Sequence, residues 1–299
     1  MHSKLTLMLA ATVLLTACST AAPPTSRRLV AHASAAGATG TLLIVDVCLN
    51  HSPLVEGDYF VISQARQGAQ ALMAATAQYF DASDVRIRSQ LIPFVCGALH
   101  DEANAPKRVA QAIDGDVSAR PQPVWIAPEV AADAEYRDAL HTLSTYIFRQ
   151  GLALAAPQAS ASAAAPNAAP PAGVRQAAAV VAQRSGRSSL IYVGVTGHSL
   201  STAKAATLGV ARVAAGVALS LAAGPIFTAG GMSYSVVFVP GGPVDKRQMV
   251  AALFDLQQAT LVRSNVIHSG GDPMKPEVLA GRDAVQLLLR DIAFANAGQ

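Results

Sequence analysis

The chain has 299 residues, enough for one large domain or two smaller ones, and 52% of them are hydrophobic while only 14% are charged. This composition argues against intrinsic disorder, which needs low hydrophobicity and high net charge. The net charge is +3, and no basic run is longer than a pair such as Arg27-Arg28, which argues against binding to nucleic acid. A chain this apolar also fits a membrane protein, provided that one of its apolar segments is long enough to span a bilayer.

The first 17 residues have the order of features found in a bacterial lipoprotein signal peptide. A short positively charged start, Met1–Lys4, precedes the apolar run Leu5–Leu15, and small residues then lead directly to a cysteine. This order resembles the lipobox, where a signal peptidase cuts before a cysteine whose thiol carries a diacylglyceryl group. The lipobox residues are Leu15, Thr16, Ala17 and Cys18. We therefore predict that residues 1–17 are removed and that Cys18 is lipidated.

Two other interpretations of the leader stay open. One is an ordinary secretory signal cut near Ala21-Ala22. The other is a transmembrane anchor, although the apolar run is shorter than the roughly 20 residues that a span needs.

Ser19 follows the lipidated cysteine and bears on the destination of the protein. In lipoproteins of double-membrane bacteria an aspartate at this position tends to retain the protein on the inner membrane. Serine therefore predicts transfer to the outer membrane, with the chain facing the periplasm. Residues 18–39 are rich in Ala, Pro, Ser and Thr and are predicted to be a tether.

With Cys18 lipidated, Cys48 and Cys96 are the two remaining cysteines, and the predicted periplasmic location permits disulfides. Each cysteine ends an apolar run, at 41–47 and 91–95 respectively. If these runs are neighbouring parallel strands, both cysteines lie near the carboxyl ends of their strands, and a bridge forms if the Cα atoms come within about 7 Å. Two buried free thiols are the alternative.

Strands and helices alternate along residues 40–154, the predicted first half of an α/β domain. Asn50–Pro53 is expected to end the first strand, and Pro93 to mark an edge or bulge. Apolar runs predict strands at 42–47, 84–95 and 124–127. Apolar residues three and four apart, or a proline near the start, predict helices at 59–80, 107–113 and 132–155.

Residues 155–173 are mostly alanine and proline and are predicted to be a flexible insertion or linker. Residues 174–299 form the second half of the domain. Helices are expected at 174–184 and 277–294, and strands at 189–196, 233–239, 249–256 and 260–268. Gly197-His198 is expected to mark the exit from the first of these strands, and the last two strands to form a hairpin. The whole predicts a layered α/β sandwich with a mixed, largely parallel sheet flanked by helices, a C-terminal antiparallel hairpin and a terminal helix.

The segment 201–231 is rich in small residues, and no charge occurs between Arg212 and Asp245. Gly224-Pro225 interrupts it, leaving 213–223 as an unbroken apolar part that is too short for a hydrocarbon core of about 30 Å. We expect either a buried helix and loop of the α/β domain or a segment that contacts a membrane or an oligomer interface.

Motifs for catalysis and metal binding are scarce. No Cys-x-x-Cys, Gly-x-Ser-x-Gly, phosphate loop or histidine pair four residues apart occurs in the sequence, and no cofactor or metal is expected. His198 and Ser199 follow a strand, and they could act with Asp46 or Asp255 in a hydrolytic arrangement. Asp46 inside an apolar strand is also explained by a hydrogen-bonded carboxylate. We expect a protein that is not an enzyme, with an envelope hydrolase as the weakest alternative.

Several segments resemble the periplasmic lipoproteins related to the curli secretion-channel lipoprotein and to the N-terminal domain of the translocation protein TolB. The resemblance is seen in the segments Thr41–Val47, Ala182–Thr196, Ser233–Val239, Val250–Leu256, Leu261–Ser264 and Gly271-Asp272-Pro273. The sequence departs from the group at Gln258-Ala259, which replaces Thr-Gly, and at Ser264, where an aromatic residue is usual. In the curli channel the central region supplies membrane-spanning hairpins, whereas residues 201–231 lack the alternation that such strands need.

Besides the hydrolase, these observations lead to one expected function and one main alternative. The first is a lipid-anchored envelope protein that works as a non-enzymatic binding or assembly component, with the membrane, envelope proteins or further copies of itself as partners and no nucleic acid. The alternative is an oligomeric subunit of a secretion channel.

Overall fold

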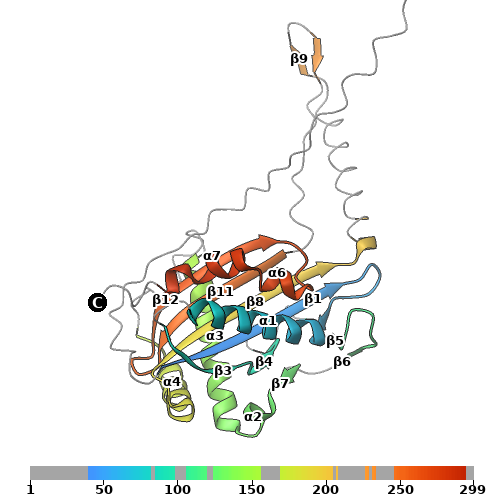
Figure 1. Cartoon of the computed structure of the whole chain (residues 1–299). Coiled ribbons are helices and arrows are strands. Elements are labelled where there is room, and N and C mark those ends of the chain that lie inside the picture. Colours follow the sequence, from blue (N-terminus) through green and yellow to red (C-terminus); the bar gives the residue numbers. More distant parts are fainter. Residues whose placement is uncertain are drawn as a thin grey trace, which may run out of the picture.

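The computed structural model describes residues 40–81, 85–97, 106–119, 124–155, 169–204, 207, 226–228, 231–233 and 246–293. Most of the strands lie in one sheet (Figure 1). Its strands are β1 (Thr41–Ser52), β2 (Tyr59–Val61), β3 (Ile87–Leu91), β5 (Arg108–Ala110), β6 (Val117–Ala119), β8 (Ser189–Leu200), β11 (Lys246–Asp255) and β12 (Thr260–Gly270). Their order is β12-β11-β8-β1-β2-β5-β6, with β3 also pairing with β1.

The centre of the sheet is parallel and its flanks are antiparallel. β1 is parallel to β8 and to β3, and β2 is parallel to β5. β11 is antiparallel to both β8 and β12, β1 is antiparallel to β2, and β5 is antiparallel to β6. Long apolar runs occupy the central strands because helices cover both of their faces.

Helices cover both faces of the sheet (Figure 1). One layer contains α1 (Ile62–Asp81), α6 (Pro276–Leu279) and α7 (Arg282–Ala293), and the other contains α3 (Ala134–Ala155) with α4 (Ala172–Ser185) packed beside it. A Cβ placed on Gly68 of α1 would lie 3.7 Å from Val47 Cγ1, and one on Gly151 of α3 would lie 2.7 Å from Val250 Cγ1. Val47 and Val250 project from opposite faces by the strand register, so the two layers enclose the sheet.

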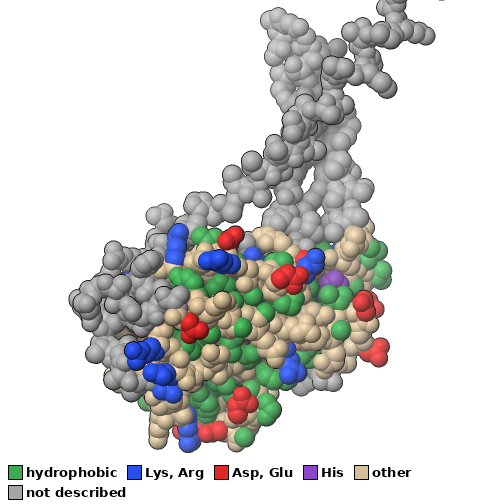
Figure 2. Space-filling view, in the orientation of Figure 1, with side chains coloured by type: hydrophobic (Ala, Val, Ile, Leu, Met, Phe, Trp, Pro, Cys, Tyr) green, Lys and Arg blue, Asp and Glu red, His purple; other side chains and the backbone are tan. Residues whose placement is uncertain are grey.

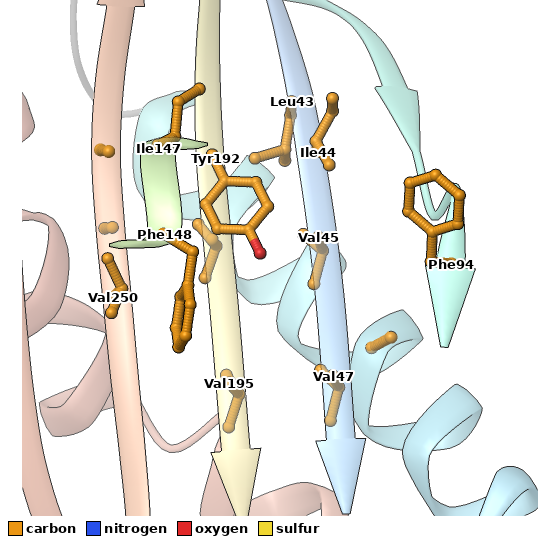
Figure 3. Packing of buried hydrophobic residues seen from close by; sticks show 14 of the residues in the cluster. Leu43, Ile44, Val45, Val47, Phe94, Ile147, Phe148, Tyr192, Val195 and Val250 are labelled. Atoms are coloured by element: carbon orange, nitrogen blue, oxygen red, sulfur yellow. The ribbon is translucent and has the colours of Figure 1, made fainter. Parts of the chain in front are cut away.

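The core lies along the central strands. Leu43, Val45 and Val47 of β1 are fully buried, and Ile147 and Phe148 of α3 approach the opposite face, where Tyr192 lies (Figure 3). Figure 3 shows the Tyr192 ring beside these α3 side chains with its hydroxyl directed towards β1.

On the outer surface, acidic and basic side chains are interspersed across the face seen in Figure 2, as is typical of a solvated protein surface.

Two short antiparallel pairs stand outside the main sheet. β4 (Phe94–Val95) pairs with β7 (Trp125–Ile126), which is followed by the short helix α2 (Pro128–Ala131). β9 (Ile226–Thr228) pairs with β10 (Gly231–Ser233). The strand expected at 233–239 lies outside the described residues apart from Ser233.

The predicted architecture is confirmed in its main features: a layered α/β fold with a mixed sheet, a C-terminal hairpin and a terminal helix. β11 and β12 form the expected hairpin across Gln257-Gln258-Ala259, where Ala259 has φ 52°. The helices expected at 132–155 and 174–184 are α3 and α4. The break expected at Pro93 separates β3 from β4, and the Pro93 carbonyl accepts a hydrogen bond from the Ala127 amide.

The helix expected at 107–113 is wrong. Arg108–Ala110 is strand β5, which pairs with β2 on one side and β6 on the other. The first three residues of the helix expected at 59–80 likewise form strand β2, because Tyr59 and Phe60 pair with the end of β1. Pairing with non-local strands outweighs local helical periodicity at both places.

Both central strands are longer than expected. Asn50–Ser52 does not end β1, and Gly197-His198 does not mark the exit from β8, because the two strands pair along their whole length from Thr41↔Ser189 to Ser52↔Leu200. The final helix, in contrast, is interrupted between α6 and α7 at Ala280-Gly281.

Candidate functional site

Polar side chains gather where β1 and β8 end together. The register places Asn50 beside His198 and Ser52 beside Leu200. Ser52 is almost completely buried, at 1% exposure, whereas His198 is half-buried. Because alternate residues of a strand face the same way, Asn50, Ser52 and His198 share one face of the sheet.

A chain of polar contacts runs from His198 through Ser52 to the β1–β2 loop. The Ser52 hydroxyl donates to Asp58 Oδ1, and the His198 Nε2 lies 3.0 Å from the same Ser52 oxygen. A hydroxyl has one proton to donate. Since that proton goes to Asp58, His198 Nε2 must donate to Ser52.

This direction of hydrogen bonding is the reverse of a nucleophilic Ser–His pair, in which the imidazole accepts the proton of the serine. Asp58 contacts the serine directly and does not orient the imidazole. The geometry therefore ties together β8, β1 and the loop. It does not prepare Ser52 for attack on a substrate.

Lys204 extends the same cluster beyond the end of β8. Its Nζ lies 3.8 Å from Asp58 Oδ1, and its backbone amide donates to Ser201 Oγ at 3.2 Å. The Ser201 amide in turn donates to the Ser52 carbonyl at 3.0 Å. These contacts fix the start of the segment that leads from β8 towards β9.

Tyr59 lies next to this cluster at the start of β2. Its ring meets the His51 ring edge-on at 5.6 Å between centroids, and its hydroxyl donates to the Ile113 carbonyl at 2.7 Å. Burial, followed by the nearby negative charge of Asp114 and Glu56, raises the pKa of Tyr59. The phenol is therefore neutral and acts as a hydrogen-bond donor.

The three residues expected for hydrolysis are not brought together. His198 and Ser199 are consecutive in β8 and so face opposite sides of the sheet, with Ser199 paired to His51. Asp46 pairs with Gly194, four residues along the strand from His198, or about 13 Å away at the usual strand rise. Asp255 lies at the other end of the sheet, where its carboxylate accepts the amides of Gln257 and Gln258 at 2.8 and 2.9 Å.

Asp46 is instead part of a buried polar pair. It is fully buried on β1, and the fully buried Tyr192 lies on the neighbouring β8. A Cβ on Gly194 would lie 2.8 Å from the Tyr192 hydroxyl, so the ring extends over Gly194 towards Asp46. Burial, and then the charge of Asp46, raise the pKa of Tyr192 well above its ordinary value.

Cys48 and Cys96 are joined by a disulfide, with 4.4 Å between their Cα atoms. Cys48 lies inside β1, so the prediction that it stands near the end of its strand is wrong. Cys96 directly follows β4 and has φ 60°. The bridge therefore joins the central strand of the main sheet to the small β4–β7 sheet.

Part of the predicted site lies outside the described residues. These residues are Leu15, Thr16, Ala17, Cys18 and Ser19. Within the described ranges no group of three or more His, Cys, Asp or Glu side chains could hold a metal ion. A separate search of those ranges finds no helix long and apolar enough to cross a membrane, and most of the segment 201–231 lies outside them.

The sequence pointed to His198 but not to its partners. The sequence predicts that Ser52 lies beyond the end of a strand, and Asp58 and Lys204 belong to no motif. Their only signal was the polar composition of two segments that follow apolar runs, which does not reveal that the two segments are neighbours.

Comparison of the chain with protein-family models, curated proteins and solved structures finds no match.

Proposed function

We propose that this protein is held on the outer membrane by acyl chains on Cys18, faces the periplasm, and works as a non-enzymatic binding or assembly component of the envelope. The observation that carries the proposal is the ordered leader that ends in Leu15, Thr16, Ala17 and Cys18. Two or three acyl chains give stable anchoring, because each buried methylene contributes about 0.8 kcal/mol.

The Cys48–Cys96 bridge supports a location outside the cytoplasm, where thiols are otherwise kept reduced. The tether suits the same location. Residues 18–39 can extend to about 70–80 Å, although a flexible chain of this length has an average span of about 25 Å. The folded domain would therefore stay close to the membrane surface.

A binding or assembly role is favoured over hydrolysis by the strand-end cluster. Ser52 donates its proton to Asp58, Asp46 lies four residues along the strands from His198, and Ser199 faces the opposite side of the sheet. The contacts of Ser52 with Asp58 and His198 form a structural network that stabilises the ends of β1 and β8.

The test is fractionation of cells that express the wild type, Cys18→Ala or Ser19→Asp. We expect the wild type in the outer-membrane fraction, with the mass of acyl chains on Cys18. The Cys18→Ala protein should lack acyl chains and should be absent from that fraction. The Ser19→Asp protein should be acylated but should remain on the inner membrane. A Cys18→Ala protein that stays in the outer membrane would contradict the proposal.

The non-enzymatic role has its own test in a deletion strain. We expect His198→Ala and Asp46→Asn, each checked for folding by circular dichroism, to restore the strain as well as the wild type does, and Cys18→Ala to fail. Loss of function in a folded His198→Ala protein would argue for the hydrolase.

A secretion-channel subunit is the second candidate. One observation favours it: β9 and β10 pair antiparallel with each other and stand outside the main sheet. Electron microscopy of the detergent-extracted protein tests this candidate, since a channel predicts rings of subunits.

A further inference from the structure

Two exposed arginines lie where the predicted tether meets the folded domain. The Thr41 amide, at the start of β1, donates to the Arg86 carbonyl at 3.0 Å. A Cβ placed on Gly40 would lie 3.0 Å from Arg88 Cβ, so Arg88 packs against the chain where it enters β1. Arg86 and Arg88 are both exposed. Both residues therefore stand beside the point where residues 18–39 join the sheet.

Arg187 adds a third guanidinium group to the same end of the sheet. It precedes β8, and its Nε donates to Ser89 Oγ of β3 at 3.1 Å. Because β3 and β8 flank the start of β1, this hydrogen bond bridges the two strands on either side of it. We refer to Arg86, Arg88 and Arg187 as the entry cluster.

The entry cluster carries a net positive charge. Arg86 and Arg88 belong to none of the ion pairs found among the described residues, whereas Arg184 of α4 engages the acidic start of α3 in two ion pairs of 3.2 Å. Asp81 ends α1 five residues before Arg86 and is exposed. Asp255 is only 8% exposed, and its carboxylate accepts two amides of the hairpin turn. Three guanidinium groups therefore outnumber the exposed carboxylate near them.

The predicted tether carries charge of the same sign. Residues 18–39 contain Arg27 and Arg28 and no Asp or Glu. A flexible segment of this length has an average span of about 25 Å. The 12 residues of β1 extend about 40 Å from the entry cluster to the far end of the strand. The entry cluster is therefore the part of the domain that an anchor on Cys18 keeps close to the membrane, whichever way the domain turns.

We propose that the entry cluster lies against the anionic phospholipid headgroups of the membrane that holds Cys18, an inference that rests on the proposed anchoring. Guanidinium groups bind phosphate oxygens through charge-assisted hydrogen bonds. The attraction of basic residues to an anionic surface falls off within a Debye length of about 8 Å, so it acts only on the end of the domain that touches the lipid.

This contact sets the orientation of the domain. In Figure 1, β1 and β8 run away from α4 and end on the side of β5 and β6. With the entry cluster on the membrane, the strand-end cluster of Ser52, Asp58 and His198 points away from the lipid. That end of the sheet then faces the partners of a binding or assembly component.

A lipid surface is favoured over an acidic protein by the position of the charge. An acidic protein in solution can approach any face of the domain with equal ease. The membrane, in contrast, is held close to one end by the tether, and the entry cluster stands at that end.

The test uses the mature chain with Cys18→Ala, which has no acyl group, and measures its sedimentation with vesicles. We expect binding to vesicles that contain phosphatidylglycerol but not to pure phosphatidylcholine, and loss of binding at high salt. Arg86→Gln with Arg88→Gln should weaken binding about 25-fold, since each arginine contributes about fivefold near an anionic surface. Arg86→Gln alone keeps the contact of Arg88 with Gly40 and should weaken binding about fivefold.

Lys107→Gln with Lys275→Gln is the matched control, because it removes the same charge from two exposed residues at the other end of the sheet. Lys107 precedes β5, whose partner β2 pairs with the end of β1. Lys275 follows Pro273, whose Cβ would lie 2.6 Å from a Cβ on Gly197, near the end of β8. The control should leave the affinity within about twofold of the wild type.

Two results overturn the proposal directly: equal binding to both kinds of vesicle, and equal weakening by the two double variants. Tighter binding to soluble polyglutamate than to anionic vesicles also overturns it, and indicates an acidic protein partner. Because the chain in this test is not acylated, the result is independent of the anchoring. A wild type that is acylated and in the outer membrane, but whose unacylated form does not bind anionic vesicles, overturns this inference and leaves the anchoring intact.

Discussion

Tyr192 and Asp46 lie fully buried on neighbouring strands, and the charge of Asp46 helps to hold Tyr192 in its neutral form. An ionised phenol and a carboxylate would repel each other at this depth in the core. The pair therefore makes the stability of the fold depend on pH in the alkaline range.

Tyr192 is expected to cause a loss of stability at high pH. Its pKa is raised in the folded state above the ordinary value of 10.0, so its contribution is complete below that value and is lost as the pH rises above it. Tyr192→Phe should therefore change stability little at neutral pH and should reduce the loss seen at about pH 11. Urea unfolding at both pH values measures this.

Tyr146→Phe is the control for that experiment. Burial also raises the pKa of Tyr146, which is only partly buried and contacts Phe254 at 6.4 Å between ring centroids. Tyr146→Phe should reduce the loss of stability at alkaline pH less than Tyr192→Phe does. Equal effects of the two substitutions would show that the Asp46–Tyr192 pair has no special role.

The disulfide is expected to be a large single contribution to stability. It closes a loop between residues 48 positions apart, which corresponds to about 4 kcal/mol of loop entropy removed from the unfolded chain. Cys48→Ala with Cys96→Ala should lower the free energy of unfolding by about 2–4 kcal/mol. A reductant should destabilise the wild type by a similar amount and leave the double variant unchanged, and a wild type indifferent to reductant would refute the bridge.

Asn265 is expected to fasten α7 to β12. Its buried amide donates to two carbonyls of the helix, so Asn265→Ala should cost about 1–3 kcal/mol in urea unfolding. Asn265→Asp should cost more, because a carboxylate cannot donate and would face the same two carbonyl oxygens. An Asn265→Asp protein as stable as the wild type would contradict this assignment.

Gly194 is expected to be required by the Tyr192 ring. An added Cβ would lie 2.8 Å from both Cε1 and the hydroxyl oxygen of Tyr192, and the fully buried ring has no room to move away. Gly194→Ala should therefore destabilise the fold by about 1–3 kcal/mol. Gly173→Ala in α4, where nothing lies within 4 Å, is the control and should have little effect or a slightly favourable one.

Local sequence was informative where an element is decided by its own composition. The β11–β12 hairpin follows from two apolar runs and a short polar turn, and α3 and α4 follow from their apolar periodicity. The predicted lipobox rests on sequence alone, because a peptidase recognises adjacent residues and needs no fold.

Tertiary structure decided what depends on neighbours that are distant in sequence. The polar ends of β1 and β8 are strand because each supplies the other with backbone hydrogen bonds, and β5 is strand because β2 and β6 flank it. The hydrogen bond between Ser52 and His198 joins residues 146 positions apart, and the charge of Asp46 acts on Tyr192 across the same separation in sequence. Residue type and spacing determine local conformation, but only the strand order shows which polar side chains meet.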